Sequence, residues 1–271
     1  MSAVSVVLIV HNQIALTRAC LESLRATTVD FELCVIDNAS TDETEAYFGS
    51  FPLPYPLRYQ RSTENAGLIR ALNQGARLAR GDVLCFIHND TEMREPAWLA
   101  RLRDALMDGA GLAGLYGAQR VRRDGRYVGR TIVHCLEGTG NLIAPVTEVA
   151  AVDGVCLCLR RVTLERVGGF DEGYGFFHGY DRDLSFAVRE AGQPCVVVDA
   201  PFLHRGGGTR TGEAAPMRAD EDLAHRRAAL ARFATKWRRR LPCDVRSLRE
   251  RLADWWRGRA RAALSRPGRG A

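Results

Sequence analysis

Residues 31–42 read FELCVIDNASTD, a short apolar run that stops at an aspartate and passes into small polar residues. Residues 83–90 read VLCFIHND and repeat this arrangement, with Asp90 shortly after the apolar run. Runs of this kind are typical of strands buried on both faces of a parallel sheet. Ligands of such sheets bind beyond the carboxyl ends of the strands. We therefore expect Asp37 and Asp90 to face one shared crevice.

Short apolar strands alternate with amphipathic helices around these two runs. Val4–Val10 predicts another buried strand, and Asn38 or Ser40 is expected to cap the helix that follows Asp37. The other elements expected up to residue 107 are helices at 17–24, 41–48, 68–79 and 95–107 and a strand at 57–60. This alternation indicates βαβ units and a mostly parallel α/β sheet.

The second half of the chain has a less regular pattern. It predicts one strand over 149–159, a turn at 167–172, a helix at 182–191, a strand at 195–198 and helices from about residue 217. We expect a globular domain over residues 1–216 and a helical extension over residues 217–271.

The composition limits the class of protein. With 271 residues, of which 46% are hydrophobic, the chain can form one large α/β domain with a short appendage. No apolar stretch approaches the roughly 18–20 residues that span a bilayer, and the N-terminus lacks signal-peptide features. We therefore expect a cytoplasmic protein. The cysteines lack C-x-x-C spacing and mostly sit in apolar runs, so we expect reduced, buried thiols: Cys34, Cys85, Cys156, Cys158 and Cys195.

Positive charge is concentrated in the extension. From Arg218 onward the chain carries sixteen Arg or Lys and six Asp or Glu residues, a balance of +10. Since the whole chain carries +6, the 217 residues before Arg218 carry −4. Leu248, Leu252 and Trp255 recur at helical spacing and form an apolar stripe. Three partners stay open for this helix: its own domain, a second subunit, or the anionic inner face of a membrane. No recognition motif accompanies the charge, so we expect no nucleic-acid binding.

Three polar clusters follow one another at spacings that resemble glycosyltransferase family 2. The first is residues 36–42, the second runs from Asn65-Ala66-Gly67 to His88-Asn89-Asp90, and the third runs from residues 167–172, VGGFDE, to residues 180–184, YDRDL. The resemblance covers about residues 4–210. It implies a GT-A fold and the transfer of a sugar from a UDP-, dTDP- or GDP-sugar to an acceptor hydroxyl. The implied acceptor is a glycan, a lipid-linked molecule or a protein.

The resemblance also assigns roles to individual residues. Asp37 matches the carboxylate that recognises the nucleoside, and Asn65 and Asp90 belong to the same donor site. Asp90 is also the last acid of the metal motif, and His204 matches a histidine of the metal or diphosphate site. Asp181 matches the base of an inverting single displacement. The implied cofactor is Mn²⁺ or Mg²⁺.

Two positions depart from the family pattern. The metal motif is His88-Asn89-Asp90 where the family has Asp-x-Asp, so Asp90 is its sole carboxylate. Tyr180 stands where the family usually has Glu. We therefore assign His88 and Tyr180 to acceptor contacts or to the residues that pack behind the site. Asp183 is assigned in the same way.

Other roles are open for the same residues. Asp37, Asp90, Asp181 and Asp183 all stand where a helix is expected to begin, and a carboxylate there can simply cap the helix or complement its dipole. A sugar nucleotidyltransferase has a similar sheet, but its Gly-rich basic loop is missing after the first strand. A dehydrogenase is excluded because no G-x-G-x-x-G motif follows that strand. A sugar-nucleotide binding module without transfer activity is the non-enzymatic alternative.

Overall fold

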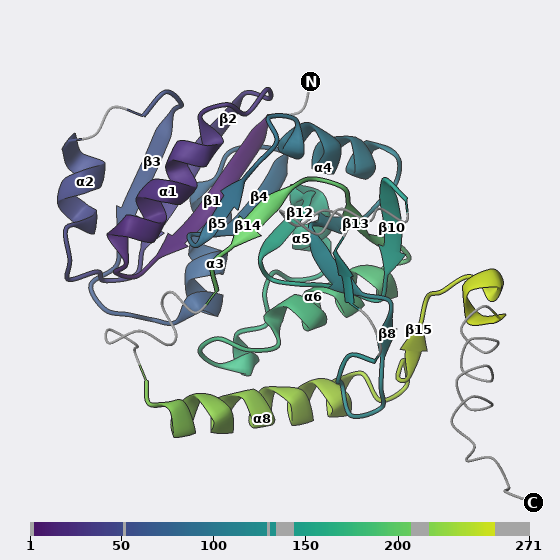
Figure 1. The fold of residues 1–271 in the computed structure, drawn as a ribbon. Coiled ribbons are helices and arrows are strands. Elements are labelled where there is room, and N and C mark those ends of the chain that lie inside the picture. The colour runs from purple at the N-terminus through teal and green to yellow at the C-terminus, as the bar shows by residue number, and fades with distance from the viewer. Residues whose placement is uncertain (1–2, 51–52, 129–130, 134–143, 207–216, 253–271) are drawn as a thin grey trace, which may run out of the picture.

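The computed structural model describes residues 3–50, 53–128, 131–133, 144–206 and 217–252. These residues form a central sheet with helices on both faces (Figure 1). The helices are α1 (Ile14–Leu24), α2 (Thr44–Ser50), α3 (Leu68–Leu78), α4 (Trp98–Met107), α5 (Arg161–Arg166), the 3-10 turn η1 (Glu172–Tyr174), α6 (Tyr180–Glu190) and α8 (Ala219–Lys236).

The central sheet has eight strands in the order β10-β13-β6-β12-β4-β1-β2-β3. Its strands are β1 (Val4–Val10), β2 (Phe31–Asp37), β3 (Leu57–Arg61), β4 (Val83–His88), β6 (Leu112–Gly114), β10 (Val146–Val149), β12 (Cys156–Arg160) and β13 (Cys195–Val198). Strands β3, β2, β1 and β4 are parallel neighbours, as are β6 and β13, whereas β12 and β10 run antiparallel to their neighbours. The predicted α/β fold with a mostly parallel sheet is confirmed.

Smaller sheets complete the fold. Strand β5 (Thr91–Met93) pairs with β14 (Phe202–His204), and β8 (Arg120–Val121) pairs with β15 (Cys243–Asp244). A third sheet joins β7 (Tyr116–Ala118), β9 (Thr131–Val133) and β11 (Ala151–Val152).

Two apolar cores lie on opposite faces of the central sheet. Along β1, Val6 and Leu8 pack toward α1 and α4 and Val7 packs toward α3, because successive side chains of a strand point to opposite faces. The second core continues through α5 and α6 to α8, where Phe233 is fully buried. The five cysteines expected to be structural are buried and free. Within the described ranges, no helix combines the length and apolar composition needed to cross a bilayer.

Two local predictions were wrong. The run over 149–159 is not one strand. The chain turns at Asp153-Gly154, between β11 of the three-stranded sheet and β12 of the central sheet. Asn38 and Ser40 do not cap α2, since the Asn38 amide contacts Asn65 and the Ser40 hydroxyl accepts from the Asn12 backbone N–H. Asp42 accepts from the Thr44 N–H at the start of α2 instead (3.1 Å).

Candidate active site

A cavity of about 370 Å³ opens at the carboxyl ends of β1 and β4. Strand register brings its residues together, because Val10 of β1 pairs with Asp37 of β2 and Ile9 of β1 pairs with His88 of β4. The two strand ends quoted at the outset therefore do meet at one edge of the sheet. The polar and charged side chains that line the cavity are His11, Asn38, Asn65, His88, Asn89, Asp90, Asp153, His178, Tyr180, Asp181, Arg182, His204 and Arg226.

Asp37 does not line this cavity, and its contact with the nucleoside stays a prediction. Its side chain has no exposed surface, and its carboxylate accepts from the Ser40 N–H (2.8 Å) and the Tyr59 hydroxyl (2.6 Å). Arg61 lies 3.4 Å from the same carboxylate. Asp37 thus has its hydrogen-bond partners within the protein and holds the loop that follows β2.

The neighbouring amides Asn38 and Asn65 line the cavity in its place. The Asn38 amide donates to Asn65 Oδ1 (2.6 Å) and accepts from the Ala66 N–H (3.0 Å). Asn12 and Ala39 both have positive φ, an uncommon backbone conformation for residues with a side chain. Asn38 thus lines the cavity, which sequence reasoning had not predicted.

Asp90 lies between two imidazole rings. His204 Nε2 lies 3.3 Å from Asp90 Oδ1, and His88 Nδ1 lies 3.9 Å from the same oxygen. One ligand atom of each of the three residues lies within 4.8 Å of the other two. Pairing of β14 with β5 places His204 opposite Thr91, next to Asp90. Two imidazoles and a carboxylate suit a divalent transition metal such as Mn²⁺, so these donors fit the implied cofactor.

The contacts within this cluster favour the ionised forms of the Asp90 carboxyl and the His204 imidazole. Burial works to raise the pKa of the Asp90 carboxyl, but the hydrogen bond from His204 and the charges of His88 and His204 outweigh it, so the pKa falls below its usual value. Burial likewise works to lower the pKa of His204, and the hydrogen bond to Asp90 more than offsets it, so that pKa is raised. A bound cation would take the place of the proton that these groups share.

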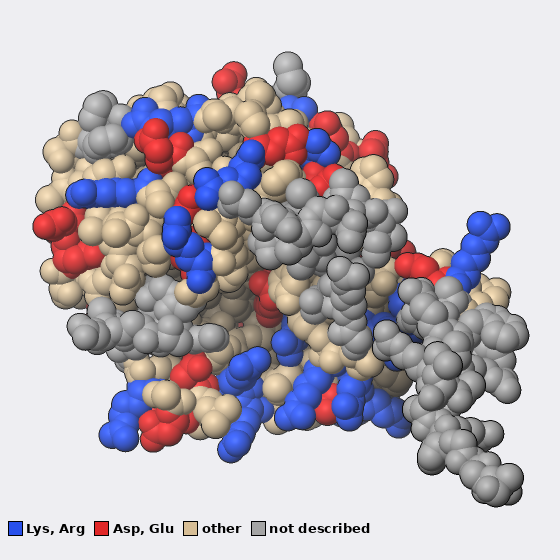
Figure 2. Space-filling model, in the orientation of Figure 1, with Lys and Arg blue, Asp and Glu red and all other residues tan. Residues whose placement is uncertain are grey.

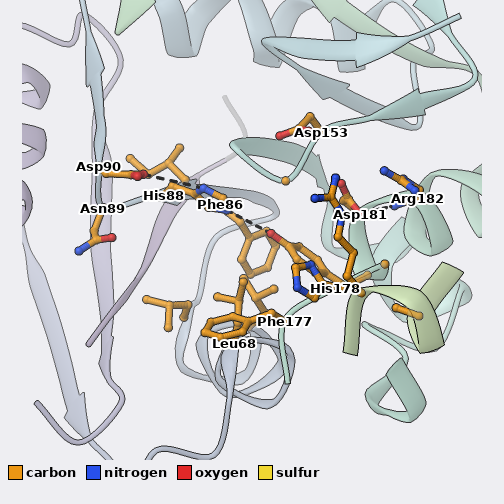
Figure 3. A pocket seen from close by; sticks show the side chains of 18 of the residues that line it. Leu68, Phe86, His88, Asn89, Asp90, Asp153, Phe177, His178, Asp181 and Arg182 are labelled. Atoms are coloured by element: carbon orange, nitrogen blue, oxygen red, sulfur yellow. Dashed lines mark hydrogen bonds and ion pairs between the residues drawn. The ribbon is translucent and has the colours of Figure 1, made fainter. Parts of the chain in front are cut away.

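The opposite side of the cavity carries a second acidic group. Figure 3 shows Asp90 and His88 at one side and Asp153, Asp181 and Arg182 at the other. Asp181 stands in the first turn of α6, and its Oδ1 accepts from the Arg182 N–H (2.8 Å). The predicted base and the predicted metal ligands thus share one cavity and lie on different walls.

Asp153 is an acidic residue of the cavity whose role the sequence did not reveal. It sits in the turn between β11 and β12, where its Oδ1 accepts from the Val155 N–H (3.1 Å). Burial, reinforced by the charge of Asp181, raises the pKa of Asp153 from 3.8 to about 6. An Asp-Gly pair that interrupts a long apolar run was the available signal for a turn at this position.

Asp183 does not line the cavity, and the sequence had left it between an acceptor contact and a residue that packs behind the site. It is buried, and its carboxylate accepts from the Tyr174 hydroxyl (2.9 Å), Lys236 Nζ (2.8 Å) and Trp237 Nε1 (2.8 Å). Asp171 binds the same Lys236 ammonium (2.8 Å). These contacts fasten the C-terminal end of α8 to the body of the protein.

Helix α8 forms part of the cavity wall through Arg226, Ala229, Leu230 and Phe233. A contact between His178 Nε2 and Asp222 Oδ1 (2.8 Å) ties its first half to the turn before α6. Lys and Arg side chains project along the edge that α8 forms, with acidic residues among them (Figure 2). The predicted extension therefore begins with a helix that helps to shape the site.

The sheet order, with a cavity at the carboxyl ends of its strands, is the architecture of the GT-A fold. The family model of glycosyl transferase family 2 matches residues 5–162, more than half of the sequence, and the chain belongs to that family.

Known proteins support this assignment. The uncharacterized protein y4gI of Sinorhizobium fredii is 27% identical over 88% of this chain and 27% of its own length. A PGL/p-HBAD biosynthesis glycosyltransferase of Mycobacterium bovis is 38% identical over 36% of this chain and 39% of its own length. The mannosyltransferase PcManGT of Pyrobaculum calidifontis, solved with GDP-Man and Mn²⁺, has a similar fold with a TM-score of 0.58. It is 20% identical, and the match covers 82% of this chain and 59% of that one. The chain thus spans well under half the length of these two curated relatives.

Proposed function

We propose that this chain transfers a sugar from a nucleotide diphosphate sugar to an acceptor hydroxyl with inversion, with Asp181 as base. The observation that carries the proposal is one cavity with a His-Asp-His cluster on one wall and Asp181 on the other. An inverting displacement needs this separation, because the leaving diphosphate and the attacking hydroxyl lie on opposite sides of the sugar.

His88, Asp90 and His204 would hold the Mn²⁺ or Mg²⁺ ion, which when bound supplies positive charge to the leaving diphosphate. Asp181 takes the proton of the acceptor hydroxyl while the acceptor oxygen forms its bond to the anomeric carbon. The bond from that carbon to the diphosphate oxygen breaks, and the nucleoside diphosphate leaves with the electron pair. A positioned general base typically contributes roughly 10²–10⁴-fold to the rate.

The donor and the acceptor are expected to occupy different parts of the cavity. Asn38 and Asn65 lie at the β2 end, where amides can recognise the base or ribose of a UDP-, dTDP- or GDP-sugar by hydrogen bonds. Asp181 and Arg226 of α8 lie on the wall that the acceptor approaches. A glycan, a lipid-linked molecule or a protein can present the accepting hydroxyl.

The test is a calorimetric titration of UDP, dTDP and GDP with Mn²⁺ and again with EDTA. We expect the bound nucleotide to need the metal, and Asp90→Asn to behave like wild type in EDTA. Glu92→Gln is the matched control, because Glu92 is equally buried next to Asp90 but binds Arg205. Equal affinity with and without metal would remove the metal from the proposal.

Transfer is distinguished from mere binding by donor hydrolysis. A nucleotide sugar at about 100 times its Kd should stabilise the fold by about 2.7 kcal/mol, which a thermal-shift panel detects. The stabilising donor should then release nucleoside diphosphate in wild type and much more slowly in Asp181→Asn. Stabilisation without any turnover would instead identify a sugar-nucleotide binding module.

We also propose that the protein works in the cytoplasm and that its basic extension contacts the membrane surface or a second subunit. Leu248 and Leu252 of the predicted apolar stripe are exposed in the structure. Trp255 lies outside the described residues. Exposed leucines next to arginines are the composition of an interfacial helix.

A further inference from the structure

The two departures from the family pattern touch each other. His88 is the last residue of β4 and Tyr180 is the first residue of α6, yet His88 Nε2 lies 3.1 Å from the Tyr180 hydroxyl. Both residues line the cavity. A histidine in place of the first motif Asp and a tyrosine in place of the Glu before the base therefore form one unit.

The position of the Tyr180 hydroxyl is set by its surroundings. Tyr180 is buried, and its ring packs edge-on against Phe170 with 6.0 Å between centroids. Gly154 faces the hydroxyl so closely that a Cβ at position 154 would overlap it. Tyr180 can reach His88 only because position 154 has no side chain.

This contact decides which nitrogen of His88 faces the metal cluster. With Nε2 engaged by Tyr180, Nδ1 is the nitrogen turned toward Asp90 Oδ1, at 3.9 Å. His204 Nε2 approaches the same oxygen at 3.3 Å from the other side. A metal-binding histidine commonly donates its second ring N–H to an oxygen acceptor, which fixes both tautomer and ring orientation. The Tyr180 hydroxyl is in place to be that acceptor.

We propose that Tyr180 positions His88 as a third metal ligand and that the resulting set of two nitrogens and one carboxylate selects Mn²⁺ over Mg²⁺. The inference rests on the proposed function, since it concerns the same metal site. Mg²⁺ demands oxygen ligands, whereas imidazole nitrogen favours transition metals. Asp at position 88 would give an oxygen-rich site suited to either ion, so His88 narrows the choice of metal.

The test measures binding of the metal alone to the full chain. Mn²⁺ is titrated with electron paramagnetic resonance, Mg²⁺ competes for the site, and nitrogen hyperfine couplings report the bound imidazoles. Wild type should show two directly coordinated histidine nitrogens and bind Mn²⁺ more tightly than Mg²⁺, because Mg²⁺ takes oxygen ligands and keeps its waters. His88→Asp should keep one nitrogen and bind the two ions with similar affinity. Control His178→Gln, which changes another histidine of the cavity, should keep both nitrogens.

A second variant separates the role of Tyr180. Tyr180→Phe should weaken Mn²⁺ binding by about 10–100-fold, the usual effect of losing the group that orients a ligand. Tyr127→Phe is the matched control, because the Tyr127 hydroxyl is also buried but Tyr127 does not line the cavity. Unchanged Mn²⁺ affinity in Tyr180→Phe would refute the positioning role.

The wild-type spectrum is decisive even where a variant folds poorly. A single coordinated nitrogen, or equal affinities for Mn²⁺ and Mg²⁺, overturns the inference. If such a protein still transfers sugar with either ion, the proposed function stands and only the selectivity is wrong. If wild type binds neither ion and yet binds nucleotide, the metal role in the proposed function fails as well.

Discussion

Asp181 and Asp183 stand two residues apart on α6, and their replacement by Asn should have opposite consequences. Asp183 is 4% exposed and accepts from Tyr174, Lys236 and Trp237, whereas Asp181 lines the cavity. Asp183→Asn should therefore destabilise the protein, and Asp181→Asn should slow transfer.

The size of the Asp183 effect follows from its contacts. An Asn at position 183 can still accept from Tyr174 and Trp237. Its neutral NH₂ group, however, replaces the carboxylate oxygen that binds the Lys236 ammonium. Breaking a buried charge pair costs about 3–5 kcal/mol. Lys236 is 37% exposed and keeps its contact with Asp171, so we expect about 2 kcal/mol here. For a chain of this size that corresponds to a fall in Tm of roughly 4–8 °C.

The assay pairs thermal unfolding with a steady-state transfer assay. Asp183→Asn should show the lower Tm and keep most of its turnover at low temperature. Asp181→Asn should keep the wild-type Tm and lose roughly 10²–10⁴-fold in turnover. A double-mutant cycle with Lys236→Met isolates the Asp183–Lys236 coupling. A wild-type Tm for Asp183→Asn would contradict the stabilising role of Asp183. If Asp183→Asn loses turnover and Asp181→Asn does not, the two residues have exchanged roles.

Three further outcomes are expected. Burial and the charge of Asp181 raise the pKa of Asp153 from 3.8 to about 6. The folded protein therefore favours the protonated form of Asp153 and loses stability as the pH rises from about 4 to 6. In EDTA, Asp153→Asn should therefore be more stable than wild type at pH 8, by up to about 3 kcal/mol, and no more stable at pH 4, as urea unfolding at both values will show. Arg226→Ala should raise the acceptor KM and leave nucleotide Kd unchanged, because Arg226 lines the α8 wall; an effect on nucleotide alone would place it on the donor side. Removal of residues 245–271, which carry the stripe of Leu248, Leu252 and Trp255, should leave nucleotide binding intact, and sedimentation with anionic liposomes that persists after truncation would exclude these residues as the membrane contact.

The local pattern of residues was enough to predict strands β1, β2 and β4, whose carboxyl ends meet at the cavity. Val4–Val10 and Cys195–Val198 have the predicted bounds, and the runs at 31–36 and 83–87 are each one residue shorter than the strands observed. A buried strand is encoded by its own apolar residues, and parallel strands necessarily bring their carboxyl ends to one edge. For this reason the shared cavity and the place of Asp90 in it followed from sequence.

The direction of each side chain was not encoded locally. Asp37 and Asp90 have the same sequence setting, yet Asp37 is fully buried against Tyr59 and Arg61 while Asp90 faces two histidines. Asp181 and Asp183 share one helical turn, and only the packing of α8 shows that Asp183 points away from the cavity.

Only the tertiary structure shows that His88 joins Asp90 and His204 in one cluster and that α8 lines the cavity. His204 reaches Asp90 because β14 pairs with β5 more than a hundred residues earlier in the chain, and α8 reaches the cavity because Phe233 fills the second core. His88, expected to contact the acceptor or to pack behind the site, is a candidate ligand because its Nδ1 faces Asp90, and α6 brings Tyr180 to its other nitrogen. The sequence alone determines where the apolar runs lie, and such runs predict buried strands because their own residues favour that setting. Contacts between distant segments depend on how whole elements pack, and no local pattern records that.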